Sequence, residues 1–117
     1  MKRVYVMWSK RLDACKIGIS VDVIDRRRIH RMMGPLVKDL EIVQSWPCAD
    51  AYSAETIALW LTRRHKLSSK EWRRMPTHRA VSIVARSVRL VNAGQAERIK
   101  KLIRERRKAE GPAYRRR

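Results

Sequence analysis

The sequence predicts a small α/β (α+β) protein in which helices flank a three-stranded, mainly antiparallel sheet and a basic helical extension follows. Three short segments alternate apolar and polar residues with a period of two, which is typical of half-buried strands. The remaining segments repeat with a period of about 3.6 residues, which is typical of amphipathic helices. With 117 residues, 44% of them apolar, the chain is long enough for one compact domain and too short for two ordinary ones.

The first two strands are expected at residues 3–8 and 15–19, joined by the polar loop S-K-R-L-D. Their apolar faces consist of Val4, Val6, Trp8, Cys15, Ile17 and Ile19. Burial of both faces on one side puts Tyr5 and Lys16 together on the opposite face, because a slip of one residue would bury the lysine. We therefore expect these two polar side chains to be neighbours.

A helix, a third strand and a second helix are expected next. Asp22 can cap a helix that runs through about Met33 and ends at Gly34-Pro35, with Arg26 and His30, four residues apart, on one side of it. Residues 40–46 alternate as a strand that Pro47 ends. A helix over about 50–66 then carries Tyr52, Glu55 and Leu59 on one stripe.

The last third of the chain is predicted to be helical. After a short extended piece, E-W-R-R-M at 71–75, an amphipathic helix covers 77–91 and ends at Gly94. Its inward residues are Val81, Val84, Val88 and Val91, and its outward residues are Arg79, Arg86 and Arg89. A very basic helix over 95–109 has a narrow apolar stripe of Ile99, Leu102 and Ile103. We expect a domain at 1–75 and a basic helical extension at 76–117 that packs on it, with a mobile tail from about 109.

The net charge of +18 indicates a polyanionic partner. The excess is uneven: residues 1–60 hold 10 basic and 7 acidic side chains, whereas residues 61–117 hold 19 and 4. Nucleic acid relieves the self-repulsion of such a chain, and arginine suits bidentate phosphate contacts. A membrane surface is disfavoured, because no helix pairs a strong apolar face with interfacial aromatic residues.

The two cysteines and the N-terminus point to a cytoplasmic protein. Cys15 and Cys48 lack the paired spacings of a zinc site, so two packed, reduced thiols are expected. The N-terminal segment has no apolar core of a signal peptide, and no apolar run approaches the length that spans a membrane.

The order and spacing of these segments resemble the GIY-YIG nuclease superfamily. The matching motifs are V-Y in the first strand, K-I-G beginning eleven residues after that tyrosine, S-x-D-x-x-x-R at 20–26, a third strand, and a helix with a glutamate. Because Lys16 replaces the first tyrosine of the second motif, the chain is similar to the phage-associated branch of the superfamily. The resemblance covers about residues 3–75, and E-W at 71–72 is similar to the E-W-F that closes many members.

The resemblance implies a GIY-YIG-like fold and a Mg²⁺-dependent DNA endonuclease with five site residues. Tyr5 would orient or activate the attacking water, and Lys16 would lower the pKa of Tyr5 or hold the nucleophile and the phosphate. Arg26 would clamp the scissile phosphate. His30 would relay a proton or orient the phosphate, and Glu55 would bind a single Mg²⁺ or Mn²⁺.

Each of these residues also has a purely structural interpretation. Tyr5 and Lys16 can be ordinary strand residues, Arg26 can belong to a charged helix face, and His30 can be a histidine with a satisfied hydrogen bond. Arg27 or Arg28 replaces Arg26 if the helix has another phase. A salt bridge to an arginine is the alternative for Glu55.

Three departures from the family pattern bear on activity. Leu59 stands four residues after Glu55, where the branch often has histidine, and the closing motif is E-W-R. The asparagine that many members carry late in the domain has no clear counterpart unless Asn92 serves.

Duplex DNA is the expected partner, and two copies of the chain are needed if both strands are cut at once. The residues expected to contact nucleic acid are Arg27, Arg28, Arg63, Arg64, Lys66, Arg73, Arg74, Arg79, Arg86, Lys100, Lys101 and Arg104. The alternatives are a DNA-binding protein that uses the fold without turnover and an RNA-binding accessory protein. Residues 77–91 and 95–109 also suggest a helix-turn-helix, although the turn between them lacks its pattern.

Overall fold

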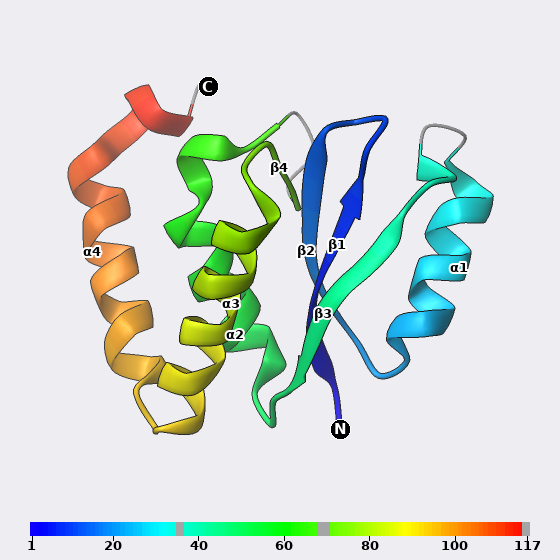
Figure 1. Ribbon diagram of the computed structural model, residues 1–117. Coiled ribbons are helices and arrows are strands. Elements are labelled where there is room, and N and C mark those ends of the chain that lie inside the picture. Colours follow the sequence, from blue (N-terminus) through cyan, green and yellow to red (C-terminus); the bar gives the residue numbers. More distant parts are fainter. Residues whose placement is uncertain (35–36, 68–70, 116–117) are drawn as a thin grey trace.

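The computed structural model describes residues 1–34, 37–67 and 71–115, apart from the side chains of Met33 and of residues 111–115 (Figure 1). The elements in chain order are β1 (Arg3–Ser9), β2 (Ala14–Ser20), α1 (Val23–Met33), β3 (Glu41–Pro47), α2 (Ala51–Leu61), the 3₁₀ helix η2 (Arg63–His65), β4 (Trp72–Arg73), α3 (Thr77–Asn92) and α4 (Ala96–Arg115). The predicted α+β class is confirmed. The described residues contain four strands, however, so the expected three-stranded sheet is wrong by one strand.

The sheet is antiparallel throughout and has the order β3-β1-β2-β4. Its extra strand is the short extended piece expected at 71–75, where Cys15 pairs with Arg73 and Lys16 with Trp72. The backbone N–H of Ile17 also donates to the carbonyl of Glu71 at 3.1 Å. A strand of two residues has no alternation of its own, which is why periodicity did not identify it.

The two faces of the sheet carry separate apolar clusters, as the alternation in the sequence predicts. Val4, Val6, Cys15 and Ile17 belong to the larger cluster, which α2 and α3 cover. The smaller cluster on the other face contains Tyr5, Met7, Val23 and Leu40. In the β1–β2 register Tyr5 is opposite Gly18 and Lys16 is opposite Met7, so the tyrosine and the lysine share one face as diagonal neighbours.

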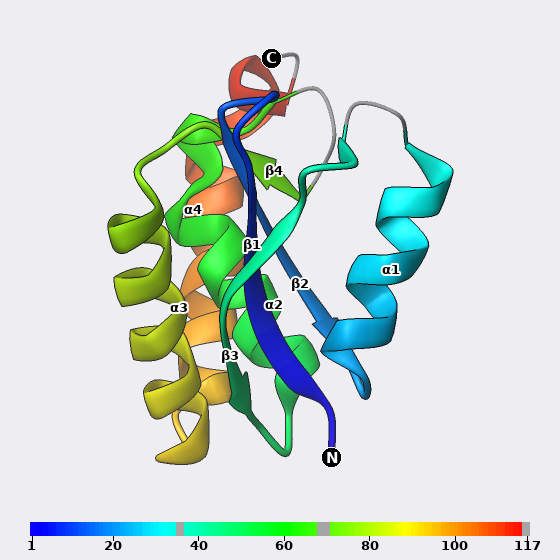
Figure 2. The same ribbon diagram turned by 45° about the vertical axis from the view of Figure 1, so that its right-hand side comes forward.

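The helices form layers on both sides of the sheet. Figure 1 shows α1 alone on one face and α2 with α3 on the other, and Figure 2 shows the same separation after rotation. Helix α4 lies outside α2 and α3 and runs in the opposite direction to α3. Ile103 of α4 is part of the larger cluster. The helical extension therefore shares the core of the sheet domain.

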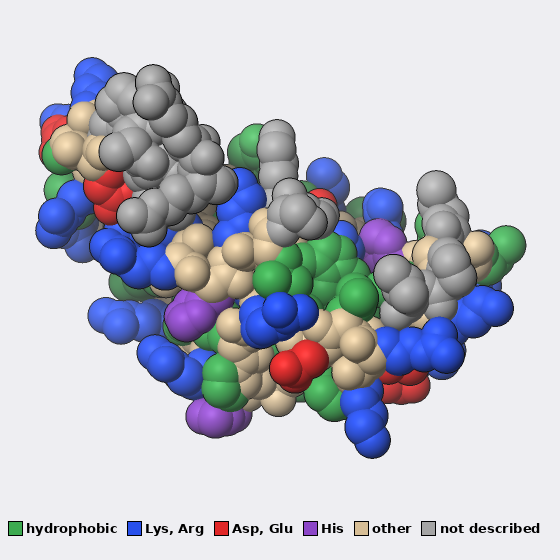
Figure 3. Space-filling model, turned by 90° about the horizontal axis from the view of Figure 1, so that it is seen from above, with side chains coloured by type: hydrophobic (Ala, Val, Ile, Leu, Met, Phe, Trp, Pro, Cys, Tyr) green, Lys and Arg blue, Asp and Glu red, His purple; other side chains and the backbone are tan. Residues whose placement is uncertain are grey.

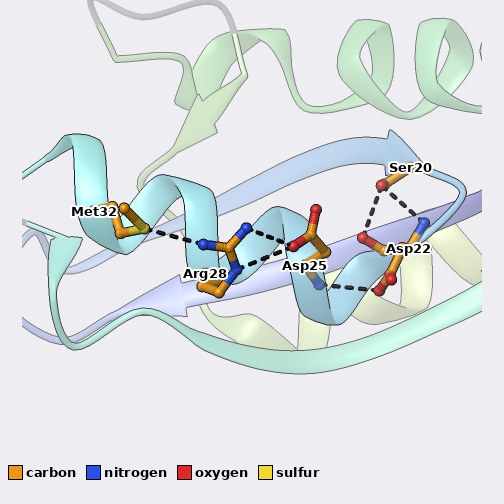
Figure 4. Close-up of polar contacts among 5 residues, drawn as sticks. All are labelled: Ser20, Asp22, Asp25, Arg28 and Met32. Carbon is orange, nitrogen blue, oxygen red and sulfur yellow. Dashed lines mark hydrogen bonds and ion pairs between the residues drawn. The ribbon is translucent and has the colours of Figure 1, made fainter.

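Capping side chains place the start of α1. The backbone N–H of Asp25 donates to Asp22 Oδ1 at 3.0 Å, as the sequence predicts for the N-cap. The hydroxyl of Ser20 accepts from the N–H of Asp22 and donates to its carbonyl (Figure 4). Gly34 is the C-cap, and Pro35 lies outside the described residues.

The other helix ends differ in part from expectation. Helix α2 ends at Leu61, and the 3₁₀ helix η2 follows it to His65. Between the two, the Thr62 hydroxyl donates to the carbonyl of Ala58 at 2.8 Å. Gly94, with φ of 81°, ends α3 as predicted. Helix α4 continues to Arg115, past residue 109 where we expected the helix to end.

Three further features concern burial. Ile103 is buried as predicted, but Leu102 is 49% exposed and lies outside the apolar stripe, because the helix shows only a narrow face to α2. Cys15 and Cys48 are buried free thiols, as expected. Within the described residues, no helix combines the length and apolar character needed to cross a membrane.

Candidate functional site

Tyr5 is the centre of the candidate site. Its ring is buried, with 2% of the residue exposed, and its hydroxyl lies over Gly18 of the neighbouring strand. A Cβ atom at Gly18 would collide with the Tyr5 ring and hydroxyl, and would lie 3.1 Å from Glu71 Oε2. Glycine at this position therefore makes the space that the phenol occupies. The same space brings the phenol close to the Glu71 carboxylate.

Helix α1 brings a histidine and an arginine to the phenol. The Tyr5 hydroxyl lies 3.5 Å from His30 Nε2. Burial lowers the pKa of His30, and the charges of Lys16 and Arg26 lower it further, so the imidazole is neutral at pH 7. Arg26, one turn before the histidine, is also within electrostatic range of the phenol.

The contacts of the three consecutive arginines select Arg26. Arg28 pairs with Asp25 at 2.9 Å and its Nη1 lies 3.2 Å from Met32 Sδ on the outer side of α1 (Figure 4). Arg27 pairs with Glu41 of β3 at 3.4 Å. The exposed Arg26 guanidinium has no hydrogen bond or ion pair within the described residues. It is therefore the arginine that remains available to a phosphate beside Tyr5.

A groove on the outer side of α1 is separate from this site. Its lining includes Ile24, Arg28, Arg31 and Lys38, and it contains none of the residues that surround Tyr5.

Lys16 is held by the fourth strand. Its ammonium lies 3.5 Å from Glu71 Oε2 and 5.6 Å from the centre of the Trp72 ring. Only 9% of the lysine side chain is exposed, whereas 40% of the Glu71 side chain is exposed. The lysine is therefore a paired, buried cation and not a solvated strand residue.

The pKa of Tyr5 concerns one of the two roles expected of Lys16. Burial and the charges of Glu71 and Glu55 raise the pKa of Tyr5 well above its usual value, and Arg26 lowers it in part. The carboxylate of Glu71, which pairs with Lys16, is the charge that raises this pKa most. That Lys16 lowers the pKa of Tyr5 stays a prediction. The other expectation, that Lys16 holds a phosphate, is compatible with its place.

Glu55 reaches the same cluster from α2. Burial and, to a smaller extent, the charge of Glu71 raise the pKa of this carboxyl to about 6, and Lys16 lowers it in part. Helix α2 packs on the opposite face of the sheet from α1, but it contacts β2. Strand β4 pairs with only two residues of β2. The carboxylate is thereby within electrostatic range of Tyr5, Lys16 and Glu71.

The donor set fits a metal ion held by one carboxylate. A half-buried carboxylate is costly without a cation, and Mg²⁺ is commonly held by one or two carboxylates, with water and substrate phosphates as further ligands. In the described part of the chain, no group of three His, Cys, Asp or Glu side chains could hold a metal. Glu55 would be the protein ligand, in the cluster that holds Arg26 and Lys16.

Arg73 was expected to contact nucleic acid, but its side chain is buried. It is 3% exposed, and its guanidinium donates to Thr62 Oγ1 at 2.9 Å and to the carbonyls of Leu59 and Trp72. Its charge serves to join β4 to the end of α2, so it is not part of a binding surface.

Two other residues of that group have contacts of their own. Arg63 stacks over the Trp60 ring at 3.7 Å and pairs with Glu110 of α4. Lys100 pairs with Glu97 and donates to Ser53 Oγ at 3.0 Å. Both side chains help to hold α4 against α2.

The other predicted contact residues lie on both sides of the sheet. The exposed ones are Arg28, Arg64, Lys66, Arg74, Arg79, Arg86, Lys101 and Arg104. Figure 3 shows Lys and Arg side chains around the rim of the face it presents, both on the α4 side and on the α1 side. The basic surface is therefore broad and is not confined to the extension.

Two residues of the cluster had no assigned role in the sequence. Gly18 was visible as part of K-I-G, and its place opposite Tyr5 follows from the strand register. Glu71 was visible only as the start of E-W-R, and nothing in the sequence placed it beside Lys16.

Two departures from the family pattern have structural explanations. Leu59 packs against the larger apolar cluster. Asn92 lies at the end of α3, with its Oδ1 3.6 Å from Cys48 Sγ, so it does not join the residues around Tyr5. Comparisons with protein-family models, with curated proteins and with solved structures find no match.

Proposed function

We propose that the protein is a metal-dependent DNA endonuclease that hydrolyses a phosphodiester bond at the Tyr5 cluster. The observation that carries this proposal is that a neutral imidazole, two cations and a half-buried carboxylate belong to one electrostatic cluster with the phenol of Tyr5. These side chains come from β1, β2, α1 and α2. Each type of group has a use in phosphodiester hydrolysis, and the resemblance to GIY-YIG nucleases assigns the same residues.

Arg26 and Lys16 would hold the scissile phosphate. Both cations lie within electrostatic range of His30. A guanidinium can donate two parallel hydrogen bonds to phosphoryl oxygens, and the ammonium adds a second positive charge. Their charges would oppose the negative charge that develops on those oxygens in the transition state.

Tyr5 and His30 would move the proton of the attacking water. The raised pKa of Tyr5 keeps the phenol protonated. The phenol oxygen can therefore accept the proton of the water only while it donates its own proton to another group. Neutral His30 accepts that proton at Nε2, 3.5 Å away, when its other nitrogen carries the ring proton. The water oxygen then bonds to phosphorus, the bond to the 3′ oxygen breaks, and the 3′ oxygen takes a proton from solvent.

Glu55 would contribute by holding the metal ion. Bound Mg²⁺ or Mn²⁺ would withdraw electron density from a phosphoryl oxygen and offset charge as the bond to the 3′ oxygen breaks.

The test separates cleavage from binding with two tyrosine variants. Tyr5→Phe removes the buried hydroxyl, and Tyr52→Phe removes the hydroxyl of a tyrosine that is 68% exposed on α2. Nicking of supercoiled plasmid and affinity for duplex DNA are measured for both variants and the wild type in Mg²⁺. We expect Tyr5→Phe to lose nicking by about 100-fold or more at unchanged affinity, and Tyr52→Phe to match the wild type.

Three outcomes contradict the proposal. Equal nicking by Tyr5→Phe and the wild type means that the cluster is not the active site. Tight duplex binding without nicking in any divalent metal indicates a DNA-binding protein that uses the fold without turnover. Tighter binding of single-stranded RNA than of duplex DNA, at matched salt, favours the RNA-binding alternative.

A further inference from the structure

The buried ammonium of Lys16 depends on Glu71, the residue before the fourth strand, and on Trp72, the first residue of that strand. A buried cation is unfavourable unless it is paired. Among the described residues, Glu71 forms the only ion pair with Lys16, and the Trp72 ring supplies a cation–π contact at 5.6 Å. Both contacts come from adjacent residues of one short segment.

The backbone fixes this segment against the lysine. The carbonyl of Glu71 accepts from the N–H of Ile17 at 3.1 Å, and Trp72 is opposite Lys16 in the β2–β4 register. The Arg73 side chain joins the segment to α2 through Thr62. The Glu71 carboxylate and the Trp72 ring therefore belong to a segment that is hydrogen-bonded to β2, the strand that carries Lys16.

We infer that Glu71 and Trp72 are positioning residues that hold the Lys16 ammonium in place for the scissile phosphate. Glu71 lies 3.5 Å from the ammonium, so the three donors of the lysine are not all used by this one carboxylate. The ammonium can keep this partner and still donate to a phosphoryl oxygen. This inference rests on the proposed function, because it gives the segment a purpose in the same reaction.

A double-mutant cycle tests whether Glu71 acts through Lys16. Glu71→Gln, Lys16→Gln and the double variant are compared with the wild type by kcat and KM for nicking. Glu97→Gln is the matched control, since it also removes one negative charge but lies on the exposed side of α4. The double variant removes both partners of the ion pair, so it leaves no unpaired buried charge.

We expect Glu71→Gln to lower kcat by about 100-fold through displacement of the ammonium, with a smaller effect on KM. In the Lys16→Gln background the same substitution should change kcat very little. Trp72→Leu should lower kcat less than Glu71→Gln, because it leaves the ion pair intact. Glu97→Gln should keep the kcat of the wild type.

Several results would overturn the inference. Reductions in kcat that multiply in the double variant mean that Glu71 acts independently of Lys16. A higher kcat in Glu71→Gln means that the carboxylate blocks the phosphate position, and an unchanged kcat means that it has no part in the reaction.

A second measurement decides the inference even if the wild type cuts no DNA. The rate at which an amine-acylating reagent labels Lys16 is followed by mass spectrometry in the wild type, Glu71→Gln and Glu97→Gln. If Glu71 holds Lys16 in place, Lys16 is labelled several-fold faster in Glu71→Gln than in the wild type, and its labelling rate in Glu97→Gln equals that of the wild type. Equal labelling in the two variants shows that Glu71 does not position Lys16, whereas failure of nicking with increased labelling rejects only the endonuclease.

Discussion

At the scale of single residues, the absent side chain of Gly18 is as important to the site as the side chains around it. The phenol of Tyr5 occupies the volume where a Cβ would lie. Because the two residues are directly opposite in the register, neither strand can shift to relieve the contact without disrupting the pairing.

Gly18→Ala is predicted to displace the Tyr5 ring. We expect the substitution to lower the free energy of unfolding by about 1–3 kcal/mol through overpacking, and to lower nicking. In a Tyr5→Leu background, which removes the clashing atoms, the cost of Gly18→Ala should shrink. Urea denaturation of the four proteins measures this coupling, and an equal cost in both backgrounds would contradict the account of Gly18.

The ionised carboxylate of Glu55 is predicted to lower the free energy of unfolding at neutral pH. Its pKa in the folded protein, about 6, is above the usual value of 4.5. Folding therefore favours the protonated form, and stability is lost as the pH rises from 4.5 through 6. We expect Glu55→Gln to raise the free energy of unfolding by about 1–2 kcal/mol at about pH 8, and much less near pH 4.5.

Magnesium provides the control for that prediction. A bound ion stabilises the folded state by mass action, so Mg²⁺ should raise the Tm of the wild type more than that of Glu55→Gln. Chemical denaturation at the two pH values and thermal unfolding with and without Mg²⁺ measure both effects. A variant less stable than the wild type at the higher pH would show that Glu55 is held by a salt bridge instead.

Some residue positions followed from the sequence, and others did not. Alternation placed Tyr5 and Lys16 on one face, because strand geometry fixes the direction of successive side chains. Helical spacing placed Arg26 and His30 together for the same kind of reason. Glu71 could not be placed, since its contact with Lys16 depends on a pairing between β2 and β4 that has no periodic signal.

At the scale of elements, α1 shows how one helix divides consecutive arginines among different tasks. Three arginines in a row point in directions about 100° apart, so they cannot share one function. Arg28 pairs within the helix, Arg27 pairs with Glu41 of β3, and Arg26 lies within electrostatic range of Tyr5.

Substitution of Arg26 and of Arg28 by alanine should therefore have different effects. We predict that Arg26→Ala lowers nicking by about 100-fold without a change in Tm, because its guanidinium has no partner within the described residues to lose. Arg28→Ala removes an exposed pair with Asp25 and should leave Tm and the nicking rate at saturating DNA almost unchanged. Equal reductions of nicking in both variants would show that the arginines act only through general charge.

The elements themselves were largely predictable where their pattern is long. β1, β2, β3, α1 and α3 match the periodic segments of the sequence, with ends set by Asp22 and Gly94. The elements and helix ends that the sequence pattern did not predict are those at which tertiary contacts form. β4 forms by pairing with β2, Thr62 after α2 accepts a hydrogen bond from Arg73 of β4, and Glu110 of the extended α4 pairs with Arg63.

At the scale of the whole molecule, the basic helices and the proposed active site are arranged on different sides. Tyr5, Lys16 and the α1 residues Arg26 and His30 belong to β1, β2 and α1. Helices α3 and α4 are on the other side of the sheet (Figure 1). We propose that the basic residues of α3 and α4 supply general affinity for the phosphate backbone, and that Arg26 and Lys16 act on one phosphate.

Neutral substitutions on α4 are predicted to change affinity and not turnover. Lys101→Gln with Arg104→Gln should weaken duplex binding for all sequences. The slope of log affinity against log salt should fall by about 1 for each phosphate that these side chains no longer neutralise. The kcat at saturating DNA should stay the same. Buried Arg73→Met is the contrasting variant, which should lower Tm and leave the salt slope unchanged.

The central claim is that Glu55 holds a metal ion for DNA cleavage at the Tyr5 cluster, and one comparison tests it most directly. Supercoiled plasmid is incubated with the wild type, Glu55→Ala and the exposed control Glu97→Ala, in Mg²⁺, Mn²⁺ or EDTA. We predict metal-dependent nicking by the wild type and Glu97→Ala, and none by Glu55→Ala, with equal duplex affinity in all three. Nicking by Glu55→Ala at the rate of the wild type, or nicking that persists in EDTA, would contradict the account.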